Sequence, residues 1–123
     1  MALEITIKTT GAVLLTGELR AFVEEKVGKL EKLLDPADTT TLAEVELESV
    51  NQSRTGDSFR AELNLSYAGG FTRAEAKRET LHAALDEAVA EARRGLRKNR
   101  TKHRDLVRRG AVRVKDFFRR FRG

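Results

Sequence analysis

The most concentrated set of like charges in this chain is the run RRGLRKNRTKHR at residues 93–104. Seven of its twelve residues are Arg or Lys, and none is acidic. Both side chains bind phosphate oxygens, Arg through a planar fork of N–H donors and Lys as a point charge. The run is therefore either a solvated segment or the face of a folded element that binds something negative.

Helical phasing sorts these charges. At 100° per residue, four arginines share a stripe about 60° wide, centred about 110° from the apolar stripe of the same predicted helix. Arginines stacked one turn apart repel one another, so stability alone does not explain the spacing, whereas a phosphate chain along the helix would. The alternative is that Lys and Arg complement the dipole at a helix C-terminus, which accounts for two or three charges. The stripe consists of Arg93, Arg97, Arg100 and Arg104, with Arg94 and Lys98 on its outer side.

Charge is distributed unevenly along the chain. The formal net charge is +5, but residues 1–90 carry 10 basic and 16 acidic side chains, whereas residues 91–123 carry 14 basic and 3 acidic ones. Solubility does not require such asymmetry. Concentrated positive charge at one end predicts a polyanionic partner, which is RNA, DNA or an anionic membrane surface.

Composition argues against several classes of function. The chain has no Cys and only two His, His82 and His103, so metal catalysis is not expected and no cofactor or metal site is predicted. His82 is interpreted as a packing or capping residue, and Glu44, Glu46 and Glu48 as a solvated strand face. No catalytic constellation or glycine-rich phosphate loop is recognisable, so an enzyme is not expected and no catalytic residue is assigned. Without a signal-peptide pattern or a run of about 20 apolar residues, a soluble, cytoplasmic protein is expected.

Strict alternation of apolar and polar residues predicts four strands, each with one buried face. In the segment LEITIK, Leu3, Ile5 and Ile7 share one side. Gly69-Gly70 is the predicted hairpin turn between the last two strands. The predicted strands are residues 3–8, 43–49, 59–67 and 71–78.

Two segments show the 3–4-residue apolar spacing of amphipathic helices. The first covers about 17–34, with Thr16 as its N-cap, and Pro36 enforces its end. The second covers about 80–104, and Gly95 interrupts it at a cost of about 1 kcal/mol relative to Ala.

The resulting order is βαβββα, an α+β fold. The first crossover should be right-handed and parallel and the remaining strands a meander, which gives a four-stranded mixed sheet. Each helix has one apolar stripe, so both are expected to pack on one face of the sheet, leaving the other face to solvent or a partner. Residues 1–104 are predicted to form this domain. Residues 105–123 are predicted to be a basic tail that is disordered or becomes helical on a partner.

The chain resembles the ribosome hibernation promoting factor family, also called ribosome-associated inhibitor or sigma modulation proteins. The resemblance covers about residues 3–104 and rests on the element order and on the segments LTGELRAFVEEKVGKLEKLL, RAEA, HAALD and LRKNRTK. It implies a non-enzymatic factor that binds 16S-type rRNA in the mRNA and tRNA channel of the small ribosomal subunit and blocks translation in starved or stationary cells. It also implies no small-molecule substrate, and a monomer when the protein is not bound to the ribosome.

The resemblance carries the family's basic residues to several positions of this chain. Lys26 and Lys29 match the segment KVGKL, Arg73 matches the arginine before the strand-four alanine, and LRKNRTK contributes four more. Lys26 also falls within the apolar arc of its helix, where the alternative is a lysine that packs its stem at the core edge. Two residues, Arg93 and Arg104, follow from the stripe geometry alone. The expected RNA-binding residues are Lys26, Lys29, Arg73, Arg93, Arg94, Arg97, Lys98, Arg100, Lys102 and Arg104.

The chain departs from the family pattern in two further ways, and two other functions stay open. His82 stands where an aromatic residue is usual. The C-terminal domain with which long-form members pair two ribosomes has no counterpart, so a short-form role is expected.

The first alternative function is that of a general double-stranded RNA-binding module. The second, which we favour less, is a membrane-surface protein attached by the basic amphipathic segment VRVKDFFRRFRG.

Overall fold

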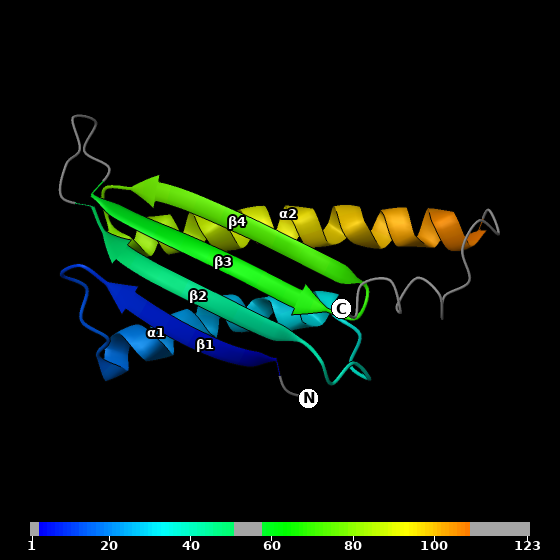
Figure 1. The fold of residues 1–123 in the computed structure, drawn as a ribbon, viewed down its shortest axis with the longest axis horizontal. Helices are drawn as coiled ribbons and strands as arrows, with labels where there is room; N and C mark the ends of the chain where they lie inside the picture. The colour runs from blue at the N-terminus through cyan, green and yellow to red at the C-terminus, as the bar shows by residue number, and fades with distance from the viewer. Residues whose placement is uncertain (1–2, 51–57, 109–123) are drawn as a thin grey trace.

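The computed structural model describes residues 3–50 and 58–108, with side chains as far as residue 99. The elements follow the predicted order βαβββα, with a 3₁₀ helix, η1, after the first α-helix (Figure 1). Each predicted strand boundary lies within two residues of the observed one. The elements are β1 Glu4–Thr10, α1 Gly17–Gly28, η1 Lys29–Leu33, β2 Leu42–Ser49, β3 Phe59–Tyr67, β4 Gly70–Arg78 and α2 Leu81–Arg108.

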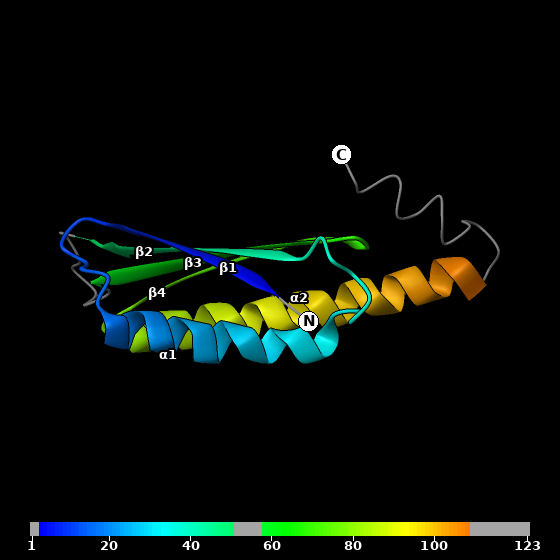
Figure 2. The ribbon, with the colours of Figure 1, turned by 90° about the horizontal axis from the view of Figure 1, so that it is seen from below.

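The strands form one mixed sheet in the order β1-β2-β3-β4. β1 runs parallel to β2, with Ile7 beside Val45, and the other two pairs are antiparallel. Both helices lie on the same face of the sheet, and no other described element covers the opposite face, which we call the open face (Figure 2). The predicted fold class is therefore confirmed: an α+β protein with two helices packed on one face of a four-stranded mixed sheet.

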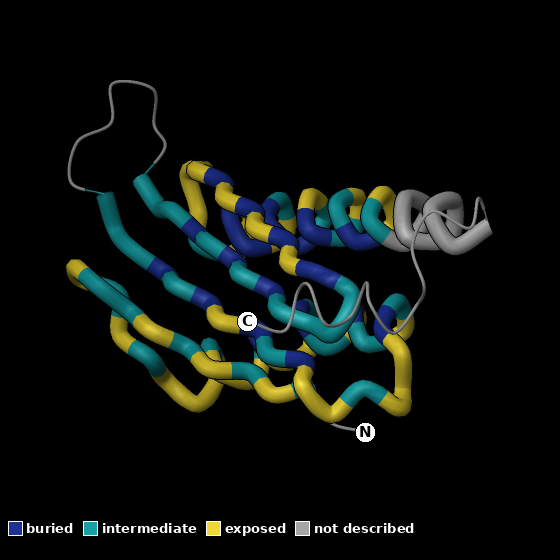
Figure 3. The backbone as a smooth tube through the Cα atoms, turned by 45° about the vertical axis from the view of Figure 1, so that its right-hand side comes forward, coloured by how far each residue is buried: buried dark blue, intermediate teal, exposed yellow. Residues whose placement is uncertain are grey.

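The core lies between the sheet and the two helices. Buried and more exposed residues alternate along β2, β3 and β4 (Figure 3). A large apolar side chain contributes roughly 1.5–3 kcal/mol when it is fully buried. Because both helices bury their apolar stripes against one sheet face, their polar surfaces are turned to solvent or toward each other. The fully buried larger side chains are Val23, Val27, Leu30, Val45, Leu47, Leu63, Leu65, Leu85 and Leu96.

The first helix begins at the predicted residue and changes its geometry before the predicted end. The Thr16 hydroxyl accepts a hydrogen bond from the Leu19 N–H at 3.1 Å, which confirms Thr16 as the N-cap. The sequence predicts α-helix to about residue 34, but α-helical geometry ends at Gly28 and five residues of 3₁₀ helix follow. Glycine has low α-helical propensity, and 3₁₀ turns are frequent at helix C-termini. The correction changes the surface of this segment, because a helix with three residues per turn aligns a different set of side chains.

The β3–β4 turn differs by one residue from the prediction. Tyr67 pairs with Gly70, so the turn residues are Ala68 and Gly69 rather than the two glycines. Gly70 instead begins β4 with φ +156°, a backbone angle that L side chains rarely adopt. A Cβ at that position would also lie 3.6 Å from the Tyr67 ring. The backbone conformation at the start of β4, and not the turn, therefore favours glycine at position 70.

The second helix continues to Arg108, past its predicted end, and contacts the sheet closely at Gly95. A Cβ on Gly95 would lie 2.7 Å from Cγ2 of Thr72 in β4. Thr72 is 7% exposed, and its hydroxyl is hydrogen-bonded to Tyr67 Oη at 3.0 Å and to Asn99 Nδ2 at 3.2 Å. Thr72 has little freedom to move aside, so the glycine allows α2 to lie close to β4.

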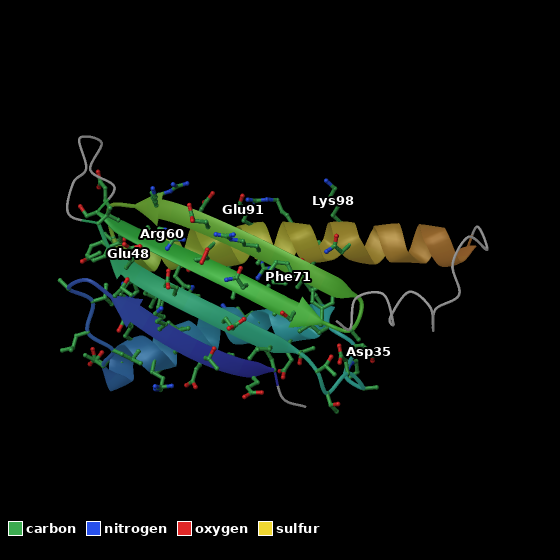
Figure 4. The ribbon with its side chains drawn as sticks, in the orientation of Figure 1. Asp35, Glu48, Arg60, Phe71, Glu91 and Lys98 are labelled. Atoms are coloured by element: carbon green, nitrogen blue, oxygen red, sulfur yellow. The ribbon has the colours of Figure 1, made fainter. Side chains whose placement is uncertain are left out.

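A cluster of one arginine and four glutamates occupies the open face (Figure 4). The Arg60 guanidinium, with 15% of the side chain exposed, contacts all four carboxylates at 2.7–3.3 Å. Burial opposes the charge of Arg60, but hydrogen bonds to Glu75 and Glu46 outweigh it, and the pKa of Arg60 lies above its usual value. Glu44, Glu46 and Glu48 were predicted to form a solvated strand face. This prediction is wrong for Glu46 and Glu48, which pair with Arg60, and it holds for the exposed Glu44. The four carboxylates belong to Glu46, Glu48, Glu62 and Glu75.

The Gly95 contact leads to a stability prediction. We expect Gly95→Ala to destabilise the protein by about 1 kcal/mol, because overpacking of about 1–3 kcal/mol outweighs a gain in helix propensity of about 1 kcal/mol. Gly28→Ala is the matched control, since nothing lies within 4 Å of a Cβ there. It should stabilise the protein by about 0.5–1 kcal/mol. Urea unfolding followed by circular dichroism measures both changes, and equal stability of the two variants would contradict the packing role of Gly95.

The Arg60 cluster should make stability depend on pH. The hydrogen bond from Arg60 is the main cause that lowers the pKa of Glu75 below its ordinary value. A carboxyl with a depressed folded-state pKa contributes stability above its unfolded-state pKa and loses it as pH falls through the folded-state value. The free energy of unfolding should therefore fall as the pH drops below 4.5, the ordinary pKa of a Glu side chain, and less steeply in Glu75→Gln. Urea unfolding between neutral pH and about pH 3 tests this; parallel profiles for wild type and variant would refute it.

Candidate nucleic-acid interface

Two helical segments that are far apart in the sequence bring four cations together. Lys29 and Lys32 of η1 and Arg93 and Arg97 of α2, together with Leu33, line a hollow of about 210 Å³. We call these five residues the basic groove. The helical layer from α1 to η1 runs beside α2 in both ribbon views (Figures 1 and 2). The cations of the two segments therefore border one common space.

Local geometry explains how these cations align. Side chains at i and i+3 eclipse in a 3₁₀ helix, so Lys29 and Lys32 are stacked along η1. On α2, Arg93 and Arg97 lie one turn apart on the same side of the helix. A leucine next to each pair is fully buried and fixes the rotation of its segment against the sheet. These leucines are Leu30 and Leu96.

The basic groove carries an excess of positive charge. Within residues 3–50 and 58–99, no carboxylate forms an ion pair with Lys29, Lys32 or Arg93. Like charges brought this close repel one another, which opposes folding when no anion is bound. A ligand with several phosphates would be attracted by all the cations of the groove at once.

Other predicted cations of α2 extend the positive surface beyond the groove. Arg94 and Lys98 are exposed, and Figure 4 shows Lys98 directed away from the sheet. Arg100, Lys102 and Arg104 lie within α2, but their side chains fall outside the described part of the chain. The part that these five residues play in binding stays a prediction.

Lys26 joins the first helix to the second. Its Nζ lies 3.3 Å from Asp86 Oδ1 on α2 and 5.7 Å from the centroid of the Phe22 ring. Its side chain is 30% exposed. This geometry favours the packing alternative for Lys26, because both its stem and its charge serve the contact between the helices. The Phe22 ring also packs on His82, with centroids 4.1 Å apart, which agrees with the packing role expected for His82.

Arg73 lies apart from the basic groove. In β4 the residues at 72, 74 and 76 are buried toward the helices, so Arg73 emerges on the open face. There its guanidinium pairs with the carboxylate of Glu62. The ten predicted residues therefore do not form one surface: Arg73 is on the open face, Lys26 is engaged between the helices, and the others lie on η1 and α2.

Sequence reasoning missed Lys32. The family segment KVGKL ends before it, and an α-helix would place Lys29 and Lys32 about 60° apart. The 3₁₀ geometry of η1 instead eclipses the two side chains. The i, i+3 spacing in KLEKL was the available signal, but its meaning depended on a helix type that the sequence pattern did not reveal.

Charged side chains are arranged differently on the two sides of the molecule. On the open face, the four carboxylates around Arg60 lie among further cations, because Lys8 pairs with Glu46 and Arg73 pairs with Glu62, whereas four cations line the basic groove. A polyanion is attracted more strongly by the groove than by this mixed cluster. Among the described residues, no set of His, Asp and Glu is placed to hold a metal ion. No helix in the described ranges has both the length and the apolar character needed to cross a bilayer.

Comparison with known proteins points to a ribosome-associated family. Residues 5–104 match the family described as Sigma 54 modulation protein / S30EA ribosomal protein. A curated relative, the Ribosome hibernation promotion factor of Deinococcus radiodurans, is 31% identical over 88 residues, which cover 72% of this chain and 44% of the relative. The chain thus spans less than half the length of that relative.

Two solved structures share the fold. The N-terminal domain of Thermus thermophilus Protein Y aligns with a TM-score of 0.65 and 25% identity, over 77% of this chain and 97% of that domain. A ribosomal subunit interface protein from Coxiella burnetii aligns with a TM-score of 0.61 and 15% identity, over 80% of this chain and 98% of that one, which is a likeness of fold. With the match over residues 5–104, the resemblance seen in the sequence is confirmed: the chain belongs to the Sigma 54 modulation protein / S30EA ribosomal protein family.

Proposed function

We propose that this protein is a ribosome hibernation factor that binds the rRNA of the small ribosomal subunit and blocks translation in starved or stationary cells. The observation that carries the proposal is the basic groove, in which cations of η1 and α2 border one space. Family membership supports a ribosomal partner, and the name of the Deinococcus radiodurans relative supports a role in hibernation.

The proposed mechanism is steric. The groove cations and those of α2 neutralise backbone phosphates and release counterions, which supplies affinity without reading the base sequence. The folded domain then occupies the channel that mRNA and tRNA need. No bond is made or broken, so the protein acts without a cofactor and not as an enzyme. Residues 1–104 form the ribosome-binding domain in this proposal, and the protein works in the cytoplasm and is monomeric away from the ribosome.

Charge reversal in the groove tests the proposal. The double variant Lys29→Glu, Arg93→Glu should weaken binding to purified small subunits by on the order of 100-fold, because two attractive phosphate contacts become repulsive. The matched control is Lys8→Glu, Lys77→Glu, which makes the same change of charge at exposed positions of the open face. Cosedimentation with small subunits measures both, and circular dichroism verifies that each variant is folded.

The control variant should bind within about threefold of wild type, since its lysines lie on the side away from the phosphates. Equal loss in both variants would mean that overall charge, and not the groove, determines binding. Wild-type binding by the groove variant would remove the groove from the interface. Equally tight binding of free duplex RNA would favour the general double-stranded RNA-binding alternative.

Salt dependence separates the two interpretations of Lys26. Neutralising a phosphate-binding cation lowers the slope of log affinity against log salt concentration by about one. Lys29→Gln should show this change. Lys26→Gln should leave the slope nearly unchanged, because its ammonium is already paired with Asp86, and should instead lower thermal stability. Equal changes of slope in the two variants would return Lys26 to the RNA-binding set.

A further inference from the structure

A second hollow adjoins the basic groove and is larger. Its volume is about 600 Å³, and it shares Lys32 and Leu33 with the groove. Its other walls are the connection from η1 to β2, residues 34–39, the β3–β4 turn, residues 67–69, and one side of α2. We call this hollow the end pocket, because it lies at the end of the sheet where the β3–β4 hairpin turns. Its volume falls in the range of pockets that hold small organic ligands.

Hydrogen bonds hold the loop walls of the end pocket in place. Asp38 Oδ2 accepts from the Ala68 N–H at 2.8 Å, which ties the η1–β2 connection to the hairpin turn. Within the connection, Asp35 Oδ1 accepts from the Ala37 N–H at 2.9 Å. Figure 4 shows Asp35 at the same end of the sheet as Phe71. These hydrogen bonds fix the loop walls, so little conformational entropy is lost when a ligand binds.

One aromatic ring and one fixed amide give the pocket its chemistry. Asn99 Nδ2 donates to Tyr67 Oη at 2.8 Å and to the Phe71 carbonyl at 3.4 Å. The Phe71 carbonyl can only accept, which agrees with a nitrogen at this position of the amide. Asn99 Oδ1 and Asp35 Oδ2 are then two acceptors to which the described residues supply no donor.

These features match the parts of a nucleotide. A flat aromatic base can pack on the Tyr67 ring and on the apolar walls, as unpaired bases do on protein aromatics. Its amino group can donate to the unused acceptors. Its phosphate would then lie toward Lys32, which belongs both to the end pocket and to the basic groove.

We propose that the end pocket binds the base of an unpaired nucleotide whose phosphates are held in the basic groove. The proposal rests on the proposed function for the phosphate-binding role of the groove, and it adds a site that reads base chemistry. Adenine, cytosine and guanine carry an exocyclic amino group and uracil does not. The two unused acceptors therefore favour the amino-bearing bases over uracil by about tenfold, the effect of one unmade hydrogen bond.

The chain contains its own reporter for this site. Tyr67 is its single tyrosine, so protein labelled with 3-fluorotyrosine gives one ¹⁹F NMR signal from the wall of the end pocket. The labelled full-length protein is titrated with GMP, UMP and ribose 5-phosphate. We expect a saturable shift with GMP, about tenfold weaker binding of UMP, and no shift with ribose 5-phosphate, which lacks a base.

A second titration distinguishes the source of the nucleotide. A single-stranded adenosine hexanucleotide is compared with an abasic hexanucleotide of the same charge. A shift with the adenosine strand and none with the abasic strand supports the pocket as a site for unpaired RNA. A shift with GMP but with neither strand supports the same base recognition with a free nucleotide as the ligand. The same shift with the base-free compounds as with GMP would overturn the proposal.

Two variants test whether the pocket itself is responsible. Ala37→Trp places a large side chain at the pocket wall and should abolish the GMP-induced shift, whereas Ala21→Trp, at an exposed position of α1 outside the pocket, should not. Asp35→Asn keeps an oxygen that can accept from the Ala37 N–H but replaces the unused acceptor Oδ2 with an amide nitrogen, which donates. It should reduce the preference for GMP over UMP. An unchanged GMP shift in a folded Ala37→Trp protein would rule out the end pocket.

Cosedimentation of these variants separates this inference from the proposed function. Base recognition is overturned, and the ribosomal role stands, if wild-type protein and Ala37→Trp bind small subunits equally and GMP leaves the ¹⁹F signal unmoved. The reverse result, a base-dependent shift without binding to small subunits, keeps the end pocket and removes the hibernation role.

Discussion

The side of this protein that carries the basic groove depends on one packing constraint: both helical segments bury their apolar stripes against the same face of a four-stranded sheet. Leu30 of η1 and Leu96 of α2 are fully buried in that interface. Rotating either segment would expose its leucine at a cost of about 1.5–3 kcal/mol. The cations beside these leucines are therefore held in the space between the segments. Burial of the core offsets their mutual repulsion, since no carboxylate among the described residues forms an ion pair with Lys29, Lys32 or Arg93.

Alternation and helical spacing were sufficient to predict the four strands and the two α-helices, because each of these elements has one face in the core and one in solvent. They did not predict the 3₁₀ helix η1. Features that depend on contacts between elements were not predictable in this way. The pairing of Glu46 opposite Glu62, which lets Arg60 bind both carboxylates, is visible only in the strand register. The packing role of Gly95 is visible only in the structure, where Thr72 of β4 lies beside it. The sequence pattern alone predicts a weakened helix at that position.

In the candidate site too, features within one element were predictable from the sequence, and contacts between elements were not. Helical phasing placed Arg93 and Arg97 on one side of a helix, and both line the basic groove. The η1 half of the groove was only partly predicted, because Lys29 was carried over by resemblance and Lys32 was not among the predicted residues. Arg73 was carried over by the same route, and the structure places it on the open face, beside Glu62. A motif shared with relatives predicts which type of residue stands at a position. It does not predict the surface on which that residue lies, because this depends on how the elements pack.

The clustering of cations in the basic groove has a kinetic consequence. A surface that concentrates positive charge would attract a polyanion before contact and raise the rate of encounter. On the open face, the carboxylates around Arg60 are instead paired with cations, among them Lys8 and Arg73. Such steering would therefore come from the groove side.

The length of α2 has a mechanical consequence. Its 28 residues extend about 42 Å at 1.5 Å per residue, whereas the nine residues of β4 span about 30 Å. Its last turns therefore project beyond the sheet (Figure 1). The Gly95 contact and the Asn99 hydrogen bonds hold α2 to the β3–β4 hairpin, at the end of the sheet from which those turns project. The projecting part is a rod about 10–12 Å wide whose direction is set by the body, and it can enter a passage that is too narrow for the two-layer domain.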